Sequence, residues 1–328
     1  MRLSKTNALI LLLTAFVLLF VILNTLRLPN TTHLWREIHN AGHTPMFGIL
    51  ALILLGFSRM LLKSRLKKRV SHYLLAFFAA SFLGALSEIL QIFEPRDADI
   101  WDLVRDIVGI IAFLCGYKVF EDYRNQHFDL HRWNVFVPFV TAVILLVGAV
   151  TPSILWIGAY SQRNSNFPSI MDFESPLQSM YVTLNSARLD RYARPSDFLA
   201  ARGKNVGRVE FQPSIYSDFI IEEPVSDWSD YDYLSMDLYS ANDTTIQIAV
   251  RIEDRHHNRH YEDRYNAVIN LEPGSHTISI DLNDIETAPE TRQMDMTQMH
   301  IIHLFTVGIN SPVNIMIDNI RLAKLLSQ

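Results

Sequence analysis

The sequence predicts a helical membrane part followed by an all-β sandwich. Residues 1–160 are almost continuously apolar and carry 15 Lys and Arg against 10 Asp and Glu, a net charge of +5. Residues 161–328 are polar, contain short alternating runs, and carry 14 basic against 24 acidic residues, a net charge of -10. This step in composition near residue 160 indicates two domains, residues 1–159 and 170–328, joined by a linker at 160–169.

Five apolar runs in the first part have the length that a bilayer crossing requires, about 20 residues each. The first run is too long for a cleaved signal peptide, and no small-residue cleavage site follows Leu28, so we expect a retained anchor. The predicted spans are residues 8–28, 44–62, 73–93, 101–120 and 135–156.

Basic residues predict the orientation of these spans. They gather at the N-terminus, in the loop at 63–69 and in the loop that contains Lys118, Arg124 and Arg132. Such loops face the cytoplasm, so five spans would place residues 160–328 outside, in the periplasm of a bacterium with its inner membrane.

Polar side chains at the outer ends of the spans predict an outward-facing pocket. Glu88 and Asp106 each lie five residues inside a predicted span, roughly 7–8 Å from its end. Ionisable groups at such depth are costly to bury and suggest a site. The predicted pocket residues are His43, Glu88, Gln91, Arg96, Asp102 and Asp106.

Four of these residues also have a structural interpretation. Asp102 falls where a first-turn acid complements the helix dipole, and Arg96 could extend towards lipid head groups. Glu88 and Asp106 could form ion pairs with Arg96 or Arg105.

The pattern His43-Thr-Pro-Met-Phe47, Ser87-Glu88-Ile-Leu-Gln91, Arg96 with Asp102, and Asp106-x-x-Gly109 resembles the VanZ-like membrane family. The resemblance covers roughly residues 34–116. His39-Asn40 replaces the family's usual Asp-Lys, and Asp106 stands where Asn is common. The resemblance implies a bacterial envelope protein that acts near cell-wall precursors or lipids.

The second part contains short alternating runs separated by turn signals such as Pro273-Gly274. Many short strands without helices between them favour a β-sandwich. The predicted strands are Tyr233–Tyr239, Thr245–Glu253, Asn266–Leu271, His276–Leu282, His300–Val307 and Asn314–Leu322.

The signposts Asp172-Phe-Glu174, Asp227-Trp228 and Ile317-Asp318-Asn319 resemble the galactose-binding-like jelly rolls found as carbohydrate-binding modules. The resemblance implies a jelly roll and a structural calcium at Glu174 and Asp318, since calcium takes oxygen ligands. The alternative for Asp318 is a turn at a strand edge. A sugar site needs exposed aromatic side chains near polar groups, and Trp228, Tyr231 and Tyr261 could supply them or could pack in the core.

The sequence supports three hypotheses for the function. The first is a non-catalytic envelope protein whose pocket meets an anionic lipid or a lipid-linked cell-wall precursor, while its jelly roll binds a glycan or an envelope protein. The second is a membrane enzyme that acts on a lipid-linked or cell-wall substrate at the outer leaflet, with Glu88 as acid or base and Arg96 binding the anion. No nucleophile motif accompanies them. The third is an anchor for the jelly roll. The acidic second part argues against nucleic acid, and the lone Cys115 excludes a disulfide within the chain.

Overall fold

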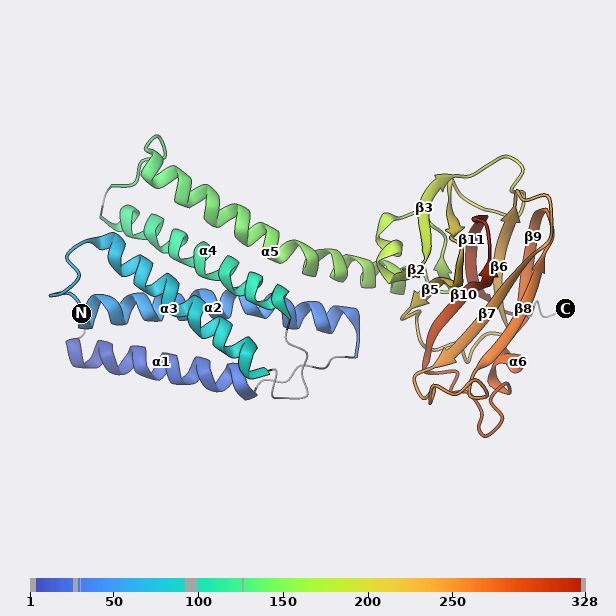
Figure 1. The fold of residues 1–328 in the computed structure, drawn as a ribbon, viewed down its shortest axis with the longest axis horizontal. Coiled ribbons are helices and arrows are strands. Elements are labelled where there is room, and N and C mark those ends of the chain that lie inside the picture. Colours follow the sequence, from blue (N-terminus) through green and yellow to red (C-terminus); the bar gives the residue numbers. More distant parts are fainter. Residues whose placement is uncertain (1–3, 26–28, 30, 92–98, 126, 326–328) are drawn as a thin grey trace. The chain divides into compact units, whose positions relative to one another are not determined.

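A computed structural model describes residues 4–25, 29, 31–91, 99–125 and 127–325. The chain divides into two compact units, Met1–Trp156 and Ile157–Gln328. We call the first the helical unit and the second the β unit; Figure 1 shows the course of the chain through both.

Five long helices make up the first part of the chain: α1 (Lys5–Thr25), α2 (His33–Leu61), α3 (Arg69–Gln91), α4 (Ile100–Arg124) and α5 (Trp133–Asn166). In the described residues, three of them are long and apolar enough to cross a membrane, namely α2, the Arg69–Ile89 part of α3, and α5. Five spans were predicted. The described apolar part of α1 ends at Leu19, and α4 carries Asp102, Arg105, Asp106 and Lys118 within its apolar stretch.

Helix α2 begins well before the predicted span at Thr44. Thr32 is its N-cap, and the Thr32 hydroxyl accepts a hydrogen bond from the Trp35 amide at 3.3 Å. Such a cap satisfies an amide that the first turn leaves without a partner. The extension carries the helix through His39 and His43, and Pro45 lies inside it.

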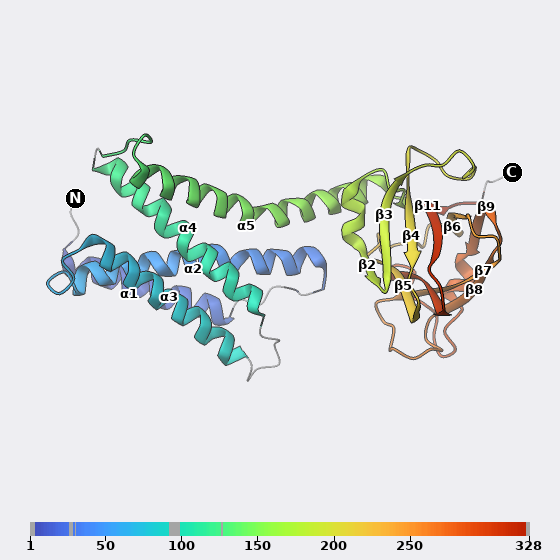
Figure 2. The same ribbon diagram turned by 45° about the horizontal axis from the view of Figure 1, so that its top comes forward.

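Helices α2, α3 and α4 pack against one another through small residues, and Figure 2 shows them side by side. Ala51, Ala80 and Ala112 are fully buried. A Cβ on Gly109 of α4 would lie 2.0 Å from the Thr44 carbonyl oxygen of α2. Only glycine therefore permits this approach of the two backbones.

A charged network joins the other ends of these three helices. Arg59 of α2 donates two hydrogen bonds to the Glu121 carboxylate of α4, at 2.8 and 3.0 Å. Arg69 and Tyr73 of α3 donate to the same carboxylate at 2.6 and 2.8 Å. With every oxygen of Glu121 engaged, the network serves packing, because buried charges are tolerated when paired and hydrogen-bonded.

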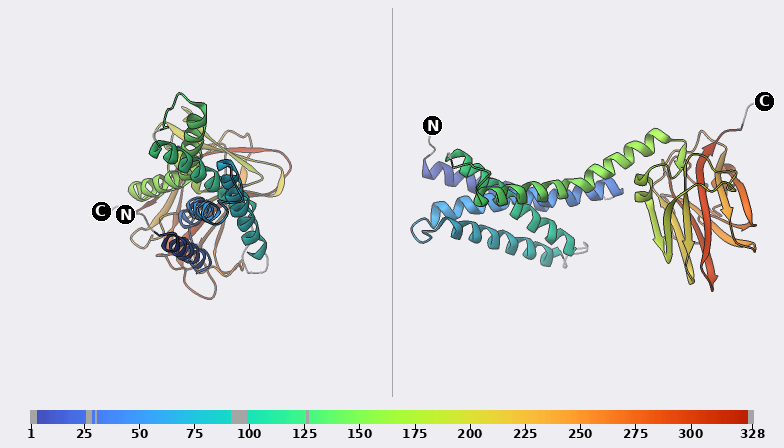
Figure 3. Two further views of the ribbon diagram at one scale, coloured as in Figure 1. Left: turned by 90° about the vertical axis from the view of Figure 1, so that its left-hand side faces the viewer. Right: turned by 90° about the horizontal axis from the view of Figure 1, so that it is seen from above.

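The β unit is a sandwich of two antiparallel sheets, and Figure 3 shows its strands running alongside one another. One sheet has the order β3-β4-β11-β6-β9 with β1 paired to β11, and the other has the order β2-β5-β10-β7-β8. We call the second the five-stranded sheet. The strands are β1 (Ser169–Met171), β2 (Val182–Asn185), β3 (Ala187–Ala193), β4 (Asn205–Phe211), β5 (Ser214–Glu222), β6 (Tyr233–Ser240), β7 (Ile246–Asp254), β8 (Tyr265–Leu271), β9 (Gly274–Asp281), β10 (Met299–Ile309) and β11 (Val313–Ala323), with short helices η1 (Pro176–Tyr181) and α6 (Leu282–Glu286).

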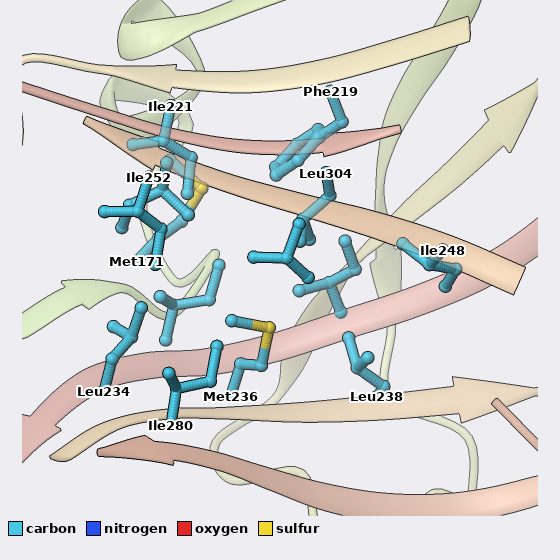
Figure 4. Packing of buried hydrophobic residues seen from close by; sticks show 14 of the residues in the cluster. Met171, Phe219, Ile221, Leu234, Met236, Leu238, Ile248, Ile252, Ile280 and Leu304 are labelled. Atoms are coloured by element: carbon cyan, nitrogen blue, oxygen red, sulfur yellow. The ribbon is translucent and has the colours of Figure 1, made fainter. Parts of the chain in front are cut away.

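All six predicted strands are present as β6 to β11, within three residues at each end. From β5 onward the chain crosses repeatedly between the sheets, as chains do in jelly rolls. The inner side chains interleave in one apolar core that includes Phe219, Met236 and Leu304, and Figure 4 shows this packing. Since strand side chains alternate between faces, the residues between these core positions point outward.

The two sheets differ in what covers their outer faces. The loop between β3 and β4 folds over the outer face of its own sheet, where Phe198 and Ala201 are buried against Tyr239 and Met316. The five-stranded sheet keeps exposed side chains on its outer face, including Tyr216, Val268 and Val307.

The segment 160–169, predicted as a linker, is mostly helical. Helix α5 continues to Asn166. Within the β unit, Arg163 donates a hydrogen bond to the Glu223 carbonyl at 2.7 Å, and the rings of Tyr160 and Tyr181 meet edge to face at 5.4 Å. These tertiary contacts support the last turns of the helix, which its polar sequence alone did not reveal.

We predict that Gly109→Ala destabilises the helical unit, because the added methyl group would collide with the Thr44 backbone. Overpacking of this kind costs roughly 1–3 kcal/mol. Gly148→Ala is the matched control, since a Cβ there meets nothing within 4 Å. Thermal unfolding of the full chain in detergent should show a lower melting temperature for Gly109→Ala alone. Equal melting temperatures for the two variants would contradict the close α2–α4 contact.

Candidate functional site

His43 of α2 lies between two carboxylates of α4. Its Nδ1 is 2.9 Å from Asp106 Oδ1, and its Nε2 is 3.6 Å from Asp102 Oδ2. Asp106 and Asp102 are four residues apart, so they share one face of α4. Asp106 is completely buried, and within the described residues its second oxygen, Oδ2, has no hydrogen-bond partner.

Arg105 and Glu88 complete this polar centre. Arg105 is 2.5 Å from Asp102 and 3.9 Å from Asp99. The Asp99 amide donates a hydrogen bond to Glu88 Oε2 at 3.3 Å, which ties α3 to the start of α4. Gly84 of α3 packs closely against this centre, since a Cβ there would lie 3.0 Å from Asp106 Oδ2.

The structure brings four of the six predicted pocket residues into this centre: His43, Glu88, Asp102 and Asp106. Arg96 lies outside the described residues, and nothing is described of the Gln91 side chain. Both ring nitrogens of His43 face carboxylates, so the centre is suited to holding and moving protons.

Of the two predicted calcium ligands, Glu174 is already engaged. Its oxygens accept hydrogen bonds from the amides of Lys204 and Asn205 at 2.6 and 2.9 Å, and from the Asn205 side chain at 3.1 Å. Asp318 is completely buried; its Oδ2 accepts from the Arg202 amide at 2.8 Å, whereas Oδ1 has no partner in the described part of the chain. Asp318 thus has an oxygen to offer a cation.

A metal site built from side chains alone does not fit. In the described residues, no three His, Cys, Asp or Glu side chains are grouped so that they could hold a metal ion. A calcium ion at Asp318 would therefore need backbone carbonyl oxygens or water, both of which calcium accepts.

Of the three aromatic residues predicted to contact a glycan, Trp228 and Tyr231 line one pocket, and Tyr261 is not among its lining residues. Trp228 is completely buried in the sandwich core, and its indole N–H donates to the Val225 carbonyl at 2.7 Å. The prediction for Trp228 was therefore wrong, because a buried ring cannot stack on a sugar. Tyr231 is half-buried against Phe167, while Tyr261 is 64% exposed with Arg264 over its ring.

The outer face of the five-stranded sheet presents aromatic rings that sequence reasoning missed. Tyr216 of β5 is 56% exposed, and its ring centre is 6.2 Å from that of Phe305 on β10. The His303 ring lies 4.6 Å from Phe305 on the other side. Three rings therefore form a row along two paired strands.

Hydrogen-bonding side chains surround this row on the same face. Asp218 pairs with Phe305 in register and accepts a hydrogen bond from His303 Nε2 at 2.9 Å. Burial lowers the pKa of His303, against the opposing effect of Asp218. We call the outward residues of the five-stranded sheet the open face: Thr183, Asn185, Tyr216, Asp218, Ile220, Glu222, Gln247, Ala249, Arg251, Glu253, Asn266, Val268, Asn270, Ile301, His303, Phe305 and Val307.

The chain matches no protein-family model and no curated protein. Among solved structures it is similar to an exo-β-agarase, with 14% identity and a TM-score of 0.40 over 49% of this chain and 26% of the agarase.

Two carbohydrate-binding modules of Clostridium thermocellum are also similar. A family 11 module in complex with a β-1,3-1,4-mixed-linked tetrasaccharide has 17% identity and a TM-score of 0.38, over 49% of this chain and 96% of the module. A family 30 module of a cellulosomal cellulase has 12% identity and a TM-score of 0.34, over 45% of this chain and 92% of the module.

We predict that Asp318 makes the β unit less stable as the pH rises. Burial, together with the negative charges of Asp237 and Asp172, raises the pKa of Asp318 to about 6. In the unfolded chain the carboxyl group titrates near pH 4. Between these values the folded state keeps a proton that the unfolded state has lost. Stability is therefore full below about pH 4 and falls by roughly 3 kcal/mol as the pH rises through 6.

Thermal unfolding of residues 157–328 at pH 5 and pH 7.5 measures this effect against Asp318→Asn, which cannot ionise. We expect the fall in melting temperature between the two pH values to be larger for the wild type than for the variant. Equal falls would show that Asp318 is not the group responsible.

Proposed function

We propose that this chain is a membrane-anchored protein that binds a glycan through the open face of its β unit. The observation that carries the proposal is the row of Tyr216, Phe305 and His303 beside hydrogen-bonding side chains. Sugar rings offer apolar C–H faces and polar hydroxyl edges, so a sugar site combines aromatic surfaces with a few oriented polar groups.

Features of the face favour a glycan over a partner protein. Protein interfaces have apolar centres with few charges. Here the rings alternate with Asp218, Arg251 and several amide side chains, and Gln247 donates to Asn270 at 3.3 Å. Amide side chains offer both a donor and acceptors, which is what sugar hydroxyls pair with.

The apolar helices support the proposed anchoring. With the basic loops inside, the orientation would expose the β unit on the periplasmic side of a bacterial inner membrane. We propose that the helical unit is VanZ-like, supported by the meeting of His43, Glu88 and Asp102. An anionic lipid or envelope protein remains an alternative partner for the chain.

We also propose a structural calcium at Asp318, near the engaged Glu174. The support is the buried Asp318 Oδ1, which has no hydrogen-bond partner in the described part of the chain. Calcium would neutralise Asp318, so repeating the pH measurement in calcium should abolish the loss of stability at pH 7.5.

We predict that Tyr216→Ala weakens glycan binding by the full chain at least tenfold, because one stacking surface is lost. Tyr192→Ala is the control, since Tyr192 is exposed to a similar degree on β3 of the other sheet. Detergent-solubilised protein on an array of bacterial and plant glycans supplies the ligand, and titration calorimetry the affinities. An array hit that survives Tyr216→Ala and Phe305→Ala would rule out the open face as the site.

A second candidate function, a membrane enzyme that acts on a lipid-linked substrate, is favoured by the Asp106–His43 contact. A buried carboxylate bonded to Nδ1 holds an imidazole in one tautomer, so that the other nitrogen can take up a proton. In His43 this is Nε2, which lies 3.6 Å from Asp102. His43 rather than Glu88 would then act as the base. It would take a proton from a hydroxyl group or water and return it to the leaving group.

For this second function we predict that His43→Gln and Asp106→Asn each abolish turnover of a labelled lipid-linked cell-wall precursor by the purified full chain. His72→Gln is the control, because His72 is also buried but bonds Ser58 at the other end of the helices. Wild-type protein without turnover, or variants as active as wild type, would exclude the enzyme.

A further inference from the structure

Two guanidinium groups lie at one end of the open face. Arg251 of β7 pairs in register with His303 on one side and Asn266 on the other. Arg264 immediately precedes β8, and its Nε donates to Asn266 Oδ1 at 2.9 Å. Asn266 therefore connects the two arginines across neighbouring strands.

The two arginines differ in their partners. Arg251 donates from Nε and one terminal nitrogen to Glu253 Oε2, at 2.8 and 2.5 Å. Arg264 lies over the Tyr261 ring at 5.1 Å, and in the part of the chain that the structure describes no carboxylate is bonded to it. Its terminal nitrogens remain available to an external acceptor.

The carboxylates near Arg264 are either paired with other side chains or exposed to solvent. Burial and the neighbouring Arg251 both lower the pKa of Arg264, and Glu253 and Glu262 oppose them. Glu253 is engaged by Arg251, while Glu262 is exposed and screened by water. Asp218, a carboxylate beside the row of rings, is engaged by His303.

We propose that the glycan bound at the open face is acidic, and that Arg264, with Arg251 beside it, binds a carboxylate of a uronic acid residue. The planar guanidinium presents paired donors that match the two oxygens of a carboxylate. The Tyr261 ring fixes the plane of Arg264, which lowers the entropy lost on binding. This inference rests on the proposed glycan-binding function and specifies its ligand.

The arrangement also gives Tyr261 a role. Its exposed ring packs against the Arg264 guanidinium. Its backbone carbonyl accepts a hydrogen bond from the Asn266 side chain at 3.0 Å. The loop that contains Tyr261 is held by Arg292, which bonds both Asp254 and Asp263 at 2.5–2.7 Å. These ion pairs therefore hold in place the loop whose Tyr261 lies against Arg264.

The test compares glycans that differ only in charge. Polygalacturonate and alginate are titrated into the detergent-solubilised full chain beside their esterified, uncharged forms. We expect at least one acid to bind tenfold or more tightly than its ester, and the difference to shrink as salt is raised, since exposed ion pairs are screened.

Variants assign the preference to a residue. Arg264→Gln should remove the preference for the acid over its ester. Arg264→Lys, which keeps the charge but loses the fork, should retain part of it. Arg208→Gln is the control, because Arg208 pairs with Asp190 on the other sheet.

The outcomes separate this inference from the proposed function. Equal binding of acid and ester, or binding of neutral array glycans alone, overturns the acidic ligand but leaves glycan binding intact. A preference for the acid that persists in Arg264→Gln overturns the assignment to Arg264. Failure of every glycan on the array and in the titrations overturns the proposed function, and the inference with it.

Discussion

The alternation of side chains along β5, β7 and β10 is the constraint on which the rest of the β unit depends. Inner residues such as Phe219, Val250 and Leu304 are committed to the core, so each residue between them must face outward. On the other sheet a loop covers the corresponding face. The five-stranded sheet is left with rings and polar groups that the core does not need. A face that contributes little to folding is free to serve another purpose, and here we propose that it binds a glycan.

In the helical unit the main constraint is the free-energy cost of burying charged side chains between apolar helices. Asp106 is completely buried, and its contact with His43 offsets part of that cost. The contact requires α2 and α4 to approach closely, which Gly109 allows. The charged network around Glu121 meets the same cost at the other ends of these helices with several donors to one carboxylate. Asp106 Oδ2 has no hydrogen-bond partner in the described residues, whereas both carboxylate oxygens of Glu121 accept hydrogen bonds. We therefore propose a proton-handling role only at His43, which contacts Asp106.

The sequence predicted what repeats locally and missed what depends on packing. The strands β6 to β11 followed from alternation and turn residues, and helical spacing placed Asp102 with Asp106. Strands β1 to β3 were missed because β1 and β2 are very short and β3 mixes charged residues with apolar ones. Strands β4 and β5 were missed as well. The burial of Trp228 and the row formed by Tyr216 and Phe305 arise between distant strands, and no local pattern records them. With β5 predicted, its outward Tyr216 and Asp218 would have been visible.

The central claim is that the open face binds a glycan. Chemical-shift mapping of isotope-labelled residues 157–328, titrated with a glycan that the full chain binds, tests it most directly. We expect the amide resonances that change on adding the glycan to cluster on β5, β7 and β10, around Asp218, Arg251 and Phe305. A cluster elsewhere, for example around Tyr231, Asp281 and Asn283, where a separate pocket of about 450 Å³ lies, would contradict it.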